Sequence, residues 1–287
     1  MIIIREKSAL MEAVKRAKSE GMTIGFVPTM GGLHAGHLSL IERCKEETDF
    51  CVASVFLNPT QFNDKNDLVT YPHDPVQDEA LLQLAGVDIM FAPSAEEMYE
   101  AGETAPKFDI GRVAEVMEGA HRPGHFEGVT WVVSKLFRLV NPDKAFFGEK
   151  DFQQIAVIRR MIEVSEDMKE IEIVPCPVIR EADGLAMSSR NNRLSDEQRS
   201  AAPKIFEALQ AGSEAQKSGS DVDEVHRLVV DMIDKHPLLK VEYFSIVDGR
   251  TLEDVKTWDE AEDVVGCITV FCGEVRLIDH IHLTSKG

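Results

Sequence analysis

A glycine-rich stretch at residues 28–37, PTMGGLHAGH, holds two side chains with clear chemical potential, His34 and His37. A β-rich run precedes it and a helical pattern follows it. Glycine lets backbone N–H groups approach a ligand closely, and a helix N-terminus favours a phosphate. Two imidazoles spaced His-x-Gly-His would add hydrogen-bond donors there. The alternative is metal chelation, but zinc needs three or four ligands, and the nearest other histidine, His73, lies in a separate loop.

A second cluster, Gly148-Glu149-Lys150-Asp151, lies between a predicted strand and a predicted helix. A cation beside a helix N-terminus is normally disfavoured, so Lys150 indicates a bound anion. Asp151 has the expected position of a capping acid. Gln153 and Gln154 follow in the first turns, where glutamine is usually exposed.

Two more polar clusters belong to predicted loops. Residues 186–191, AMSSRN, combine two hydroxyls with the guanidinium of Arg190, and such groups can hold several phosphate oxygens. Residues 58–62, NPTQF, place a carboxamide and a hydroxyl just after a strand. A polar linker and a simple turn are the alternative interpretations. We expect all four clusters to line one edge of one sheet.

The elements that must position these groups alternate between strand and helix. Strands are predicted at Ile2–Arg5, Thr23–Val27, Asp49–Leu57, Asp88–Phe91, Lys144–Phe147 and Ile171–Pro175, and helices at Ser8–Glu20, His37–Glu47, Val76–Ala85, Glu127–Leu139 and Asp151–Val164. This order predicts an α/β fold, a Rossmann-like doubly wound parallel sheet with helices on both faces. Ligands bind such sheets beyond the carboxyl ends of the strands.

The pattern changes near Glu181. Helices at about Asp196–Lys217 and Val222–Lys235 precede three β-rich runs, at Val241–Val247, Val264–Phe271 and Val275–His280, the last two joined as a hairpin. We therefore expect two domains. Residues 1–180 form the Rossmann-like domain, and residues 181–287 form a second, smaller α+β domain, hinged around Ile179–Gly184.

Composition restricts the function classes. The 287 residues carry 31 basic and 50 acidic side chains, a net charge of −19, which opposes binding to nucleic acid because that depends on basic groups. A small anion can still be held by a few focused cations. There is no apolar run of the ~18 residues that a membrane span needs, and the short apolar stretch at the N-terminus is not expected to act as a secretory signal. The five cysteines contain no CxxC pair and are expected to be free, buried thiols of a cytoplasmic protein.

Five motifs in order give the chain a family resemblance: PTMGGLHAGH, FLNPTQF, EGAHRPGHFEGV, FFGEKDFQQ and READGLAMSSRN. They resemble the pantothenate synthetase (pantoate–β-alanine ligase) family, closely from about Ile24 to Ser195 and loosely beyond. That family belongs to the HxGH nucleotidyltransferases. The resemblance implies an ATP-dependent condensation of (R)-pantoate with β-alanine through a pantoyl-adenylate, releasing AMP and pyrophosphate.

The same resemblance implies roles for individual residues. Catalytic roles fall on His37, as proton donor, and on His34, Lys150 and Arg190. Pantoate would be bound by Gln61 and Gln154, with β-alanine near Gln61. The implied ATP site consists of Met30, Gly31, Gly32, Leu33, His34, Ala35, Gly36, His37, Gly148, Glu149, Lys150, Asp151, Ile179, Met187, Ser188, Ser189 and Arg190.

The resemblance further implies Mg²⁺ carried with the nucleotide, no metal site of the protein itself, and a homodimer. Burial of an adenylate would protect it from water, so we expect the second domain to close over it. One rival is another HxGH adenylyltransferase, which would keep AMP in its product; tRNA charging fits the negative charge poorly. A non-catalytic nucleotide-binding module is the remaining alternative, and ATP consumption distinguishes it.

Overall fold

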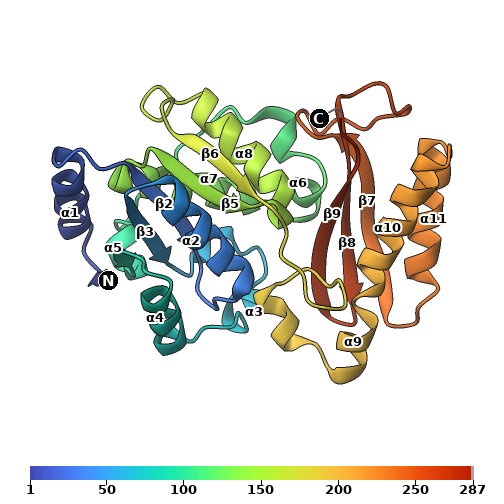
Figure 1. The fold of residues 1–287 in the computed structure, drawn as a ribbon, viewed down its shortest axis with the longest axis horizontal. Coiled ribbons are helices and arrows are strands. Elements are labelled where there is room, and N and C mark those ends of the chain that lie inside the picture. The colour runs from blue at the N-terminus through green and yellow to red at the C-terminus, as the bar shows by residue number, and fades with distance from the viewer. Residues whose placement is uncertain (286–287) are drawn as a thin grey trace.

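The chain folds around two sheets that lie side by side (Figure 1). A computed structural model of the chain describes residues 1–285. The first sheet contains six strands: β1 (Ile2–Ile4), β2 (Ile24–Thr29), β3 (Phe50–Val55), β4 (Ile89–Phe91), β5 (Lys144–Gly148) and β6 (Glu172–Cys176). All neighbouring strands pair in parallel, in the order β1-β4-β3-β2-β5-β6. The predicted parallel sheet is confirmed, with each strand within about two residues of its expected bounds.

The strand order reverses between β2 and β5. From β2 the chain builds β3 and β4 on one side, and later it returns to add β5 and β6 on the other. The two loops that leave β2 and β5 therefore diverge, and a crevice opens between them at the carboxyl edge of the sheet. This is where open α/β sheets bind their ligands.

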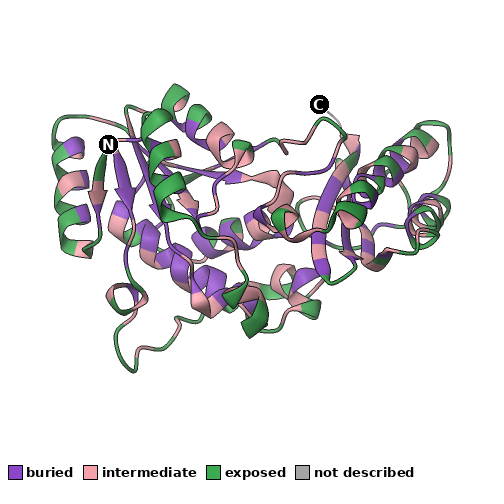
Figure 2. Cartoon of the chain, turned by 90° about the horizontal axis from the view of Figure 1, so that it is seen from below, coloured by how far each residue is buried: buried purple, intermediate pink, exposed green. Residues whose placement is uncertain are grey.

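Helices cover both faces of this sheet because its strands alternate their side chains between two apolar layers. Phe26, Val52 and Phe147 face a core shared with α1 (Lys7–Ser19), α7 (His125–Val140) and α8 (Phe152–Glu163). Val27 and Phe146 face the opposite core, with α2 (Ala35–Glu47) and α4 (Pro75–Leu84). Figure 2 shows that the central strands β2, β3 and β4 are almost entirely buried.

Short helical turns complete the first domain. They are η1 (Pro59–Gln61), α3 (Lys65–Val69), α5 (Ala95–Met98), η2 (Gly111–Ala114), α6 (Glu118–His121) and η3 (Glu149–Asp151). Most of them were not predicted, because segments of this length contain too few residues for a helical period to be recognised.

The second sheet is antiparallel, in the order β7 (Leu239–Asp248), β8 (Asp263–Cys272) and β9 (Val275–Ser285). One face packs Phe244, Ile246 and Ile268 against α10 (Lys204–Lys217) and α11 (Val222–Asp234). The other face places Val265 and Cys267 in a cluster with side chains of the first domain. The predicted α+β unit and its hairpin are confirmed, and the sheet is covered on both sides.

One predicted helix was wrong. The structure divides the expected helix Asp196–Lys217 into α9 (Asp196–Ala201) and α10, with Pro203 before the first residue of α10. Proline cannot donate a backbone hydrogen bond, so the helical ladder is interrupted there. Preceding these helices, η4 (Ser189–Arg193) brings the chain back toward the first domain.

The two parts are joined by ion pairs as well as by the chain. Arg180 makes two hydrogen bonds to Asp279 on β9, at 2.6 and 2.9 Å. Glu118 of α6 accepts two from Arg276 on β9, both at 2.6 Å. All five cysteines are free and buried, as predicted. Within the described residues, no helix combines the length and apolarity needed to cross a membrane.

Candidate active site

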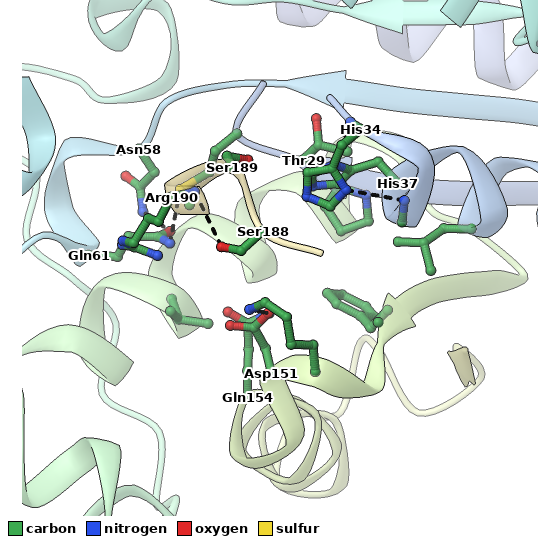
Figure 3. A pocket seen from close by; sticks show the side chains of 18 of the residues that line it. Thr29, His34, His37, Asn58, Gln61, Asp151, Gln154, Ser188, Ser189 and Arg190 are labelled. Carbon is green, nitrogen blue, oxygen red and sulfur yellow. Dashed lines mark hydrogen bonds and ion pairs between the residues drawn. The ribbon is translucent and has the colours of Figure 1, made fainter. Parts of the chain in front are cut away.

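A cleft of about 1350 Å³, counted to its open mouth, lies at the carboxyl ends of β2 and β5. Every polar cluster singled out in the sequence contributes to its wall (Figure 3). Of the predicted site residues, the cleft is lined by Met30, His34, Gly36, His37, Gln61, Gly148, Lys150, Asp151, Gln154, Ile179, Met187, Ser188, Ser189 and Arg190.

Five predicted ATP contacts lie beside the cleft and are not among its described lining residues: Gly31, Gly32, Leu33, Ala35 and Glu149. The reason is visible for two of them. The buried carboxylate of Asp78 accepts hydrogen bonds from the N–H groups of Gly32 at 3.0 Å and Leu33 at 2.8 Å. These N–H groups hold the turn together and are not directed at a ligand. Gly31 and Gly32 supply the positive φ that the turn requires, 85° and 63°.

The two histidines fix each other through the backbone of the helix start. Helix α2 begins at Ala35, two residues earlier than predicted, and His34 is its N-cap. The Nδ1 atom of His34 accepts from the N–H of Gly36 at 3.1 Å, and the Nδ1 atom of His37 accepts from the N–H of His34 at 3.3 Å. Both rings therefore use Nδ1 as an acceptor, and each neutral ring carries its proton on Nε2.

Burial keeps these rings neutral. Desolvation, aided by the charge of Lys150, lowers the pKa of His34 to about 4. Desolvation, with His34 and Lys150 adding to it, lowers the pKa of His37 to about 3. At neutral pH the pair thus presents two Nε2–H donors. A neutral imidazole donates a hydrogen bond to an anion, whereas a general acid must first be protonated.

The cationic side chains enter the cleft already paired. Lys150 contacts the carboxylate of Asp151 at 3.1 Å. Asp151 is the N-cap residue of α8, the position predicted for it, but its side chain makes no capping hydrogen bond to the helix. Arg190 binds Asp67 of α3 through two nitrogens, at 3.2 and 2.7 Å, and Arg193 binds the same carboxylate at 2.8 Å. An incoming polyanion would compete with Asp67 and Asp151 for these cations.

The two hydroxyls where the loop enters η4, on its N-cap Ser188 and its first residue Ser189, differ in availability. Ser189 donates to the carbonyl of Gly32 at 3.0 Å, which fastens this loop to the glycine turn. Ser188 accepts from the N–H of Arg190 at 3.3 Å and keeps its own hydroxyl proton for a ligand. Nearby, the carbonyl of Ile179 accepts from the N–H of Met187 at 2.9 Å.

The far end of the cleft contains a neutral polar group, the carboxamide of Gln61, which is 8% exposed. Asn58 donates to its Oε1 at 2.9 Å, and its Nε2 contacts the sulfur of Met30 at 3.2 Å. The hydroxyl of Tyr99 holds Asn58 in turn, at 2.7 Å. Figure 3 shows Gln61 beside Asn58, across the cavity from Gln154 and Asp151.

Two lining residues, Arg122 and His125, had no role assigned from the sequence. Arg122 contacts Nε2 of His125 at 3.2 Å, and Nδ1 of His125 contacts the carbonyl of Gln61 at 2.8 Å. Both belong to the motif EGAHRPGHFEGV, so the signal was present, but only the fold brings that segment to the cleft. Gln153, expected to be exposed, is buried and donates to two carbonyls of the first domain.

Comparison with known proteins gives a consistent result over nearly the whole chain. A family model described as pantoate-β-alanine ligase matches residues 2–282. A pantothenate synthetase of Porphyromonas gingivalis is 54% identical over 98% of this chain and 99% of its own. One from Bacteroides fragilis is 51% identical, covering 98% of each chain.

Solved structures agree with the sequence relatives. A pantothenate synthetase from Thermus thermophilus superposes with a TM-score of 0.92 at 43% identity, covering 99% of this chain and 100% of that one. A pantoate-β-alanine ligase from Francisella tularensis, complexed with "Beta-gamma ATP" and β-alanine, gives 0.78 at 33% identity, covering 99% and 98%.

Proposed function

The chain belongs to the pantoate–β-alanine ligase family, and from this premise we propose that its cleft performs the reaction in two steps through a pantoyl-adenylate. The overall activity is the ATP-dependent formation of pantothenate from pantoate and β-alanine. One observation carries the assignment of the reaction to this cleft. Two histidines, a lysine and an arginine from three separate segments line the same cavity.

In the first step, a carboxylate oxygen of pantoate attacks the α-phosphorus of ATP, and the bond to the bridging oxygen of pyrophosphate breaks. Negative charge grows on the phosphate oxygens. The Nε2–H groups of His34 and His37, the ammonium of Lys150 and the guanidinium of Arg190 are the donors that would stabilise it. Donors fixed before the reaction are effective because they need no reorganisation during it.

The pairing of the cations supports this assignment. Lys150 is half of an ion pair with Asp151, and Arg190 is held by Asp67. Both cations are therefore preorganised at the cleft wall, in a protein whose net charge is −19. A few focused cations can capture an anion in such a protein.

Mg²⁺ fits the cleft as a partner of the nucleotide. Asp151 is the one carboxylate among the described lining residues, and Mg²⁺ commonly binds through one or two carboxylates together with substrate phosphates. A Mg²⁺ ion bound to ATP would neutralise part of the phosphate charge, and Asp151 is the residue that could contact it.

Pantoate would lie at the Gln61 end, with Gln61 and Gln154 binding its hydroxyls. Asn58 fixes the orientation of Gln61, so Gln61 would keep its Nε2 directed into the cleft. In the second step, the amine of β-alanine attacks the adenylate carbonyl and AMP leaves. Arg122, beside Gln61, would attract the β-alanine carboxylate. No protein nucleophile is needed in either step.

Together with this reaction we propose three further features of the protein: its domain division, its oligomeric state and its location in the cell. The domains are residues 1–180 and 181–287, with closure of the second over the adenylate. The protein is a homodimer; Val69, Val76 and Leu84, each at least 80% exposed, are apolar groups of the first domain that an interface could cover. A cytoplasmic location is supported by the free cysteines and by the need for ATP.

Product analysis tests the reaction. The chain is incubated with ATP, Mg²⁺, pantoate and β-alanine, and the expected products are AMP, pyrophosphate and pantothenate in equal amounts. When β-alanine is omitted, each active site should form one pantoyl-adenylate, which stays bound to the protein. A product that retains AMP after β-alanine is added would instead indicate a nucleotidyltransferase.

A further inference from the structure

A histidine-rich cluster lies next to the cleft, where the second domain meets the first. Strand β9 is the edge of the second sheet nearest the first domain (Figure 1). It carries His280 and His282, and the turn η3 brings Glu149 against them. We propose that Glu149, His280 and His282 form a binding site for a transition-metal dication of the Zn²⁺ class, separate from the Mg²⁺ of the nucleotide.

The geometry suits such an ion. The three ligand atoms, one from each residue, lie within 4.8 Å of one another. Zinc bonds to nitrogen and oxygen are about 2.0–2.2 Å, so tetrahedral ligands lie about 3.4 Å apart. The required contraction, at most about 1.4 Å, is within the range of side-chain rotation for a glutamate and for His282, whose side chain is 39% exposed. Two imidazoles and a carboxylate are typical zinc ligands and leave a fourth position open.

His280 is the strongest reason to expect a ligand. It is 4% exposed, and its Nδ1 atom is buried with no hydrogen-bond partner in the described chain. An unsatisfied buried polar group costs about 1–3 kcal/mol, so its presence calls for an explanation. Desolvation, together with the charge of His282, lowers the pKa of His280 to about 3. The ring is therefore neutral at physiological pH, the form that binds metals.

His282 has the support that metal-binding histidines usually have. Its Nδ1 atom contacts the carboxylate of Asp263 on the neighbouring strand β8 at 2.7 Å. Metal-binding histidines commonly donate their second ring N–H to a carboxylate, which fixes the tautomer and raises ligand basicity. This hydrogen bond leaves Nε2 of His282 for the metal.

The local charge also permits a cation. Two basic groups are near His280, but both are paired: Arg180 with Asp279, at 2.6 Å, and Lys150 with Asp151, at 3.1 Å. Within residues 1–285, Glu149 forms no ion pair, and the carboxylate of Asp263 pairs with His282 and with no lysine or arginine. A dication would therefore meet two carboxylates whose charge is not already neutralised by lysine or arginine.

Binding at this place would connect the domains. Glu149 precedes Lys150 in the turn η3, whereas His280 and His282 belong to β9. A metal held by all three would fasten β9 to the turn that carries Lys150. Since the ion would bind the folded chain, it should raise the melting temperature by mass action.

The test uses the intact chain, treated with EDTA and then dialysed, with no nucleotide or substrate. Zn²⁺ is titrated by calorimetry and by thermal unfolding, and Co²⁺ is used as a spectroscopic probe. We expect one high-affinity Zn²⁺ per chain, a raised melting temperature, and a Co²⁺ spectrum without a thiolate charge-transfer band. Because no substrate is present, a failure to bind Zn²⁺ would overturn only the metal site and would not affect the proposed ligase reaction.

Variants assign the site. His282→Ala removes an exposed side chain and should fold; it should weaken Zn²⁺ binding at least about tenfold, as should Glu149→Gln. His236→Ala, which removes a histidine from the turn between α11 and β7, should bind Zn²⁺ normally. The proposal is overturned if Zn²⁺ does not bind, if its affinity is unchanged in His282→Ala, if it is lost in His34→Gln instead, or if the Co²⁺ spectrum shows thiolate ligands.

Discussion

The backbone N–H of His34 donates to Nδ1 of His37 at 3.3 Å, so the first histidine of the motif determines which nitrogen of the second carries the proton. A second hydrogen bond fixes the other ring: the N–H of Gly36 donates to Nδ1 of His34, two residues earlier, at 3.1 Å. The motif spacing therefore produces two Nε2–H donors with fixed orientation. The proposed role of the pair in catalysis depends on this arrangement.

Both rings should stay neutral, with the proton on Nε2, from about pH 5.5 to about pH 8, because desolvation lowers their pKa values to about 4 and about 3, well below that range. Nitrogen-15 NMR of histidine-labelled protein without nucleotide measures the tautomer and its titration. A midpoint near the usual ~6.5 for either ring would contradict the assignment. The charge of bound ATP should raise both pKa values.

Gly36→Ala should impair adenylation while the fold remains stable. A Cβ at this position would lie 2.9 Å from Cε1 and 3.0 Å from Nδ1 of His34, so the ring must turn away. Alanine is otherwise favoured in a helix. We expect pyrophosphate exchange into ATP, measured with pantoate present, to fall about 10²-fold. Ser39→Ala, on the same helix but outside the described cleft lining, should exchange normally.

His37→Ala and Lys150→Ala should each slow adenylate formation at least about 10²-fold, the usual effect of removing one preorganised donor. The measurement is again pyrophosphate exchange, with circular dichroism to confirm folding. Lys45→Ala is the matched control, because Lys45 contacts Asp88 outside the cleft. Exchange rates near that of the unaltered chain in the two cleft variants would reject their assigned roles.

Gln61→Ala and Gln154→Ala should weaken pantoate binding about tenfold, the equivalent of ~1.4 kcal/mol, and leave ATP affinity unchanged. Asn58→Ala should reproduce part of this loss, because Asn58 orients the Gln61 carboxamide. Calorimetric titration of pantoate provides the measurement. Gln77→Ala, an exposed glutamine of α4, should bind pantoate normally. Unchanged affinity in Gln61→Ala would remove it from the pantoate site.

Glu118→Gln should destabilise the contact between the two domains in a pH-dependent way. Burial alone would raise the pKa of Glu118, but hydrogen bonds and charge from Arg276, with Arg122 and Tyr243, hold it at about 2. A depression from about 4.5 to about 2 corresponds to about 3 kcal/mol. Since the folded pKa is depressed, this stability is present above about pH 4.5 and is lost as the pH falls toward about 2.

Urea unfolding of the unaltered protein and of Glu118→Gln at about pH 7, 5 and 3.5 checks this dependence. The difference in unfolding free energy should be close to about 3 kcal/mol at neutral pH and smaller at the most acidic point. Glu127→Gln, at an exposed position of α7, should show no comparable difference. If the difference in unfolding free energy between the unaltered protein and Glu118→Gln stays constant with pH, Glu118 acts by packing and not by its charge.

The sequence by itself determined the local features of this protein. Short β-rich runs that alternate with helical patterns predicted the strands and the placement of helices on both faces of the sheet. The amphipathic stripe of α7 was equally clear, with Val129, Val132, Val133, Leu136 and Val140 all buried. The motifs after β2 and β5 also predicted many of the residues that line the cleft, since their position after a strand places them at one edge of a parallel sheet.

The tertiary structure decided which partner each polar group takes. Asp78 holds the glycine turn from 46 residues away in the chain, and Asp67 holds Arg190 across a separation of 123. The side chain of Asp151 pairs with Lys150 and makes no capping hydrogen bond to its helix. A carboxylate can satisfy any nearby donor, so its choice depends on which segments close packing brings within about 3 Å. Periodic patterns in the sequence do not show which distant segments come this close together.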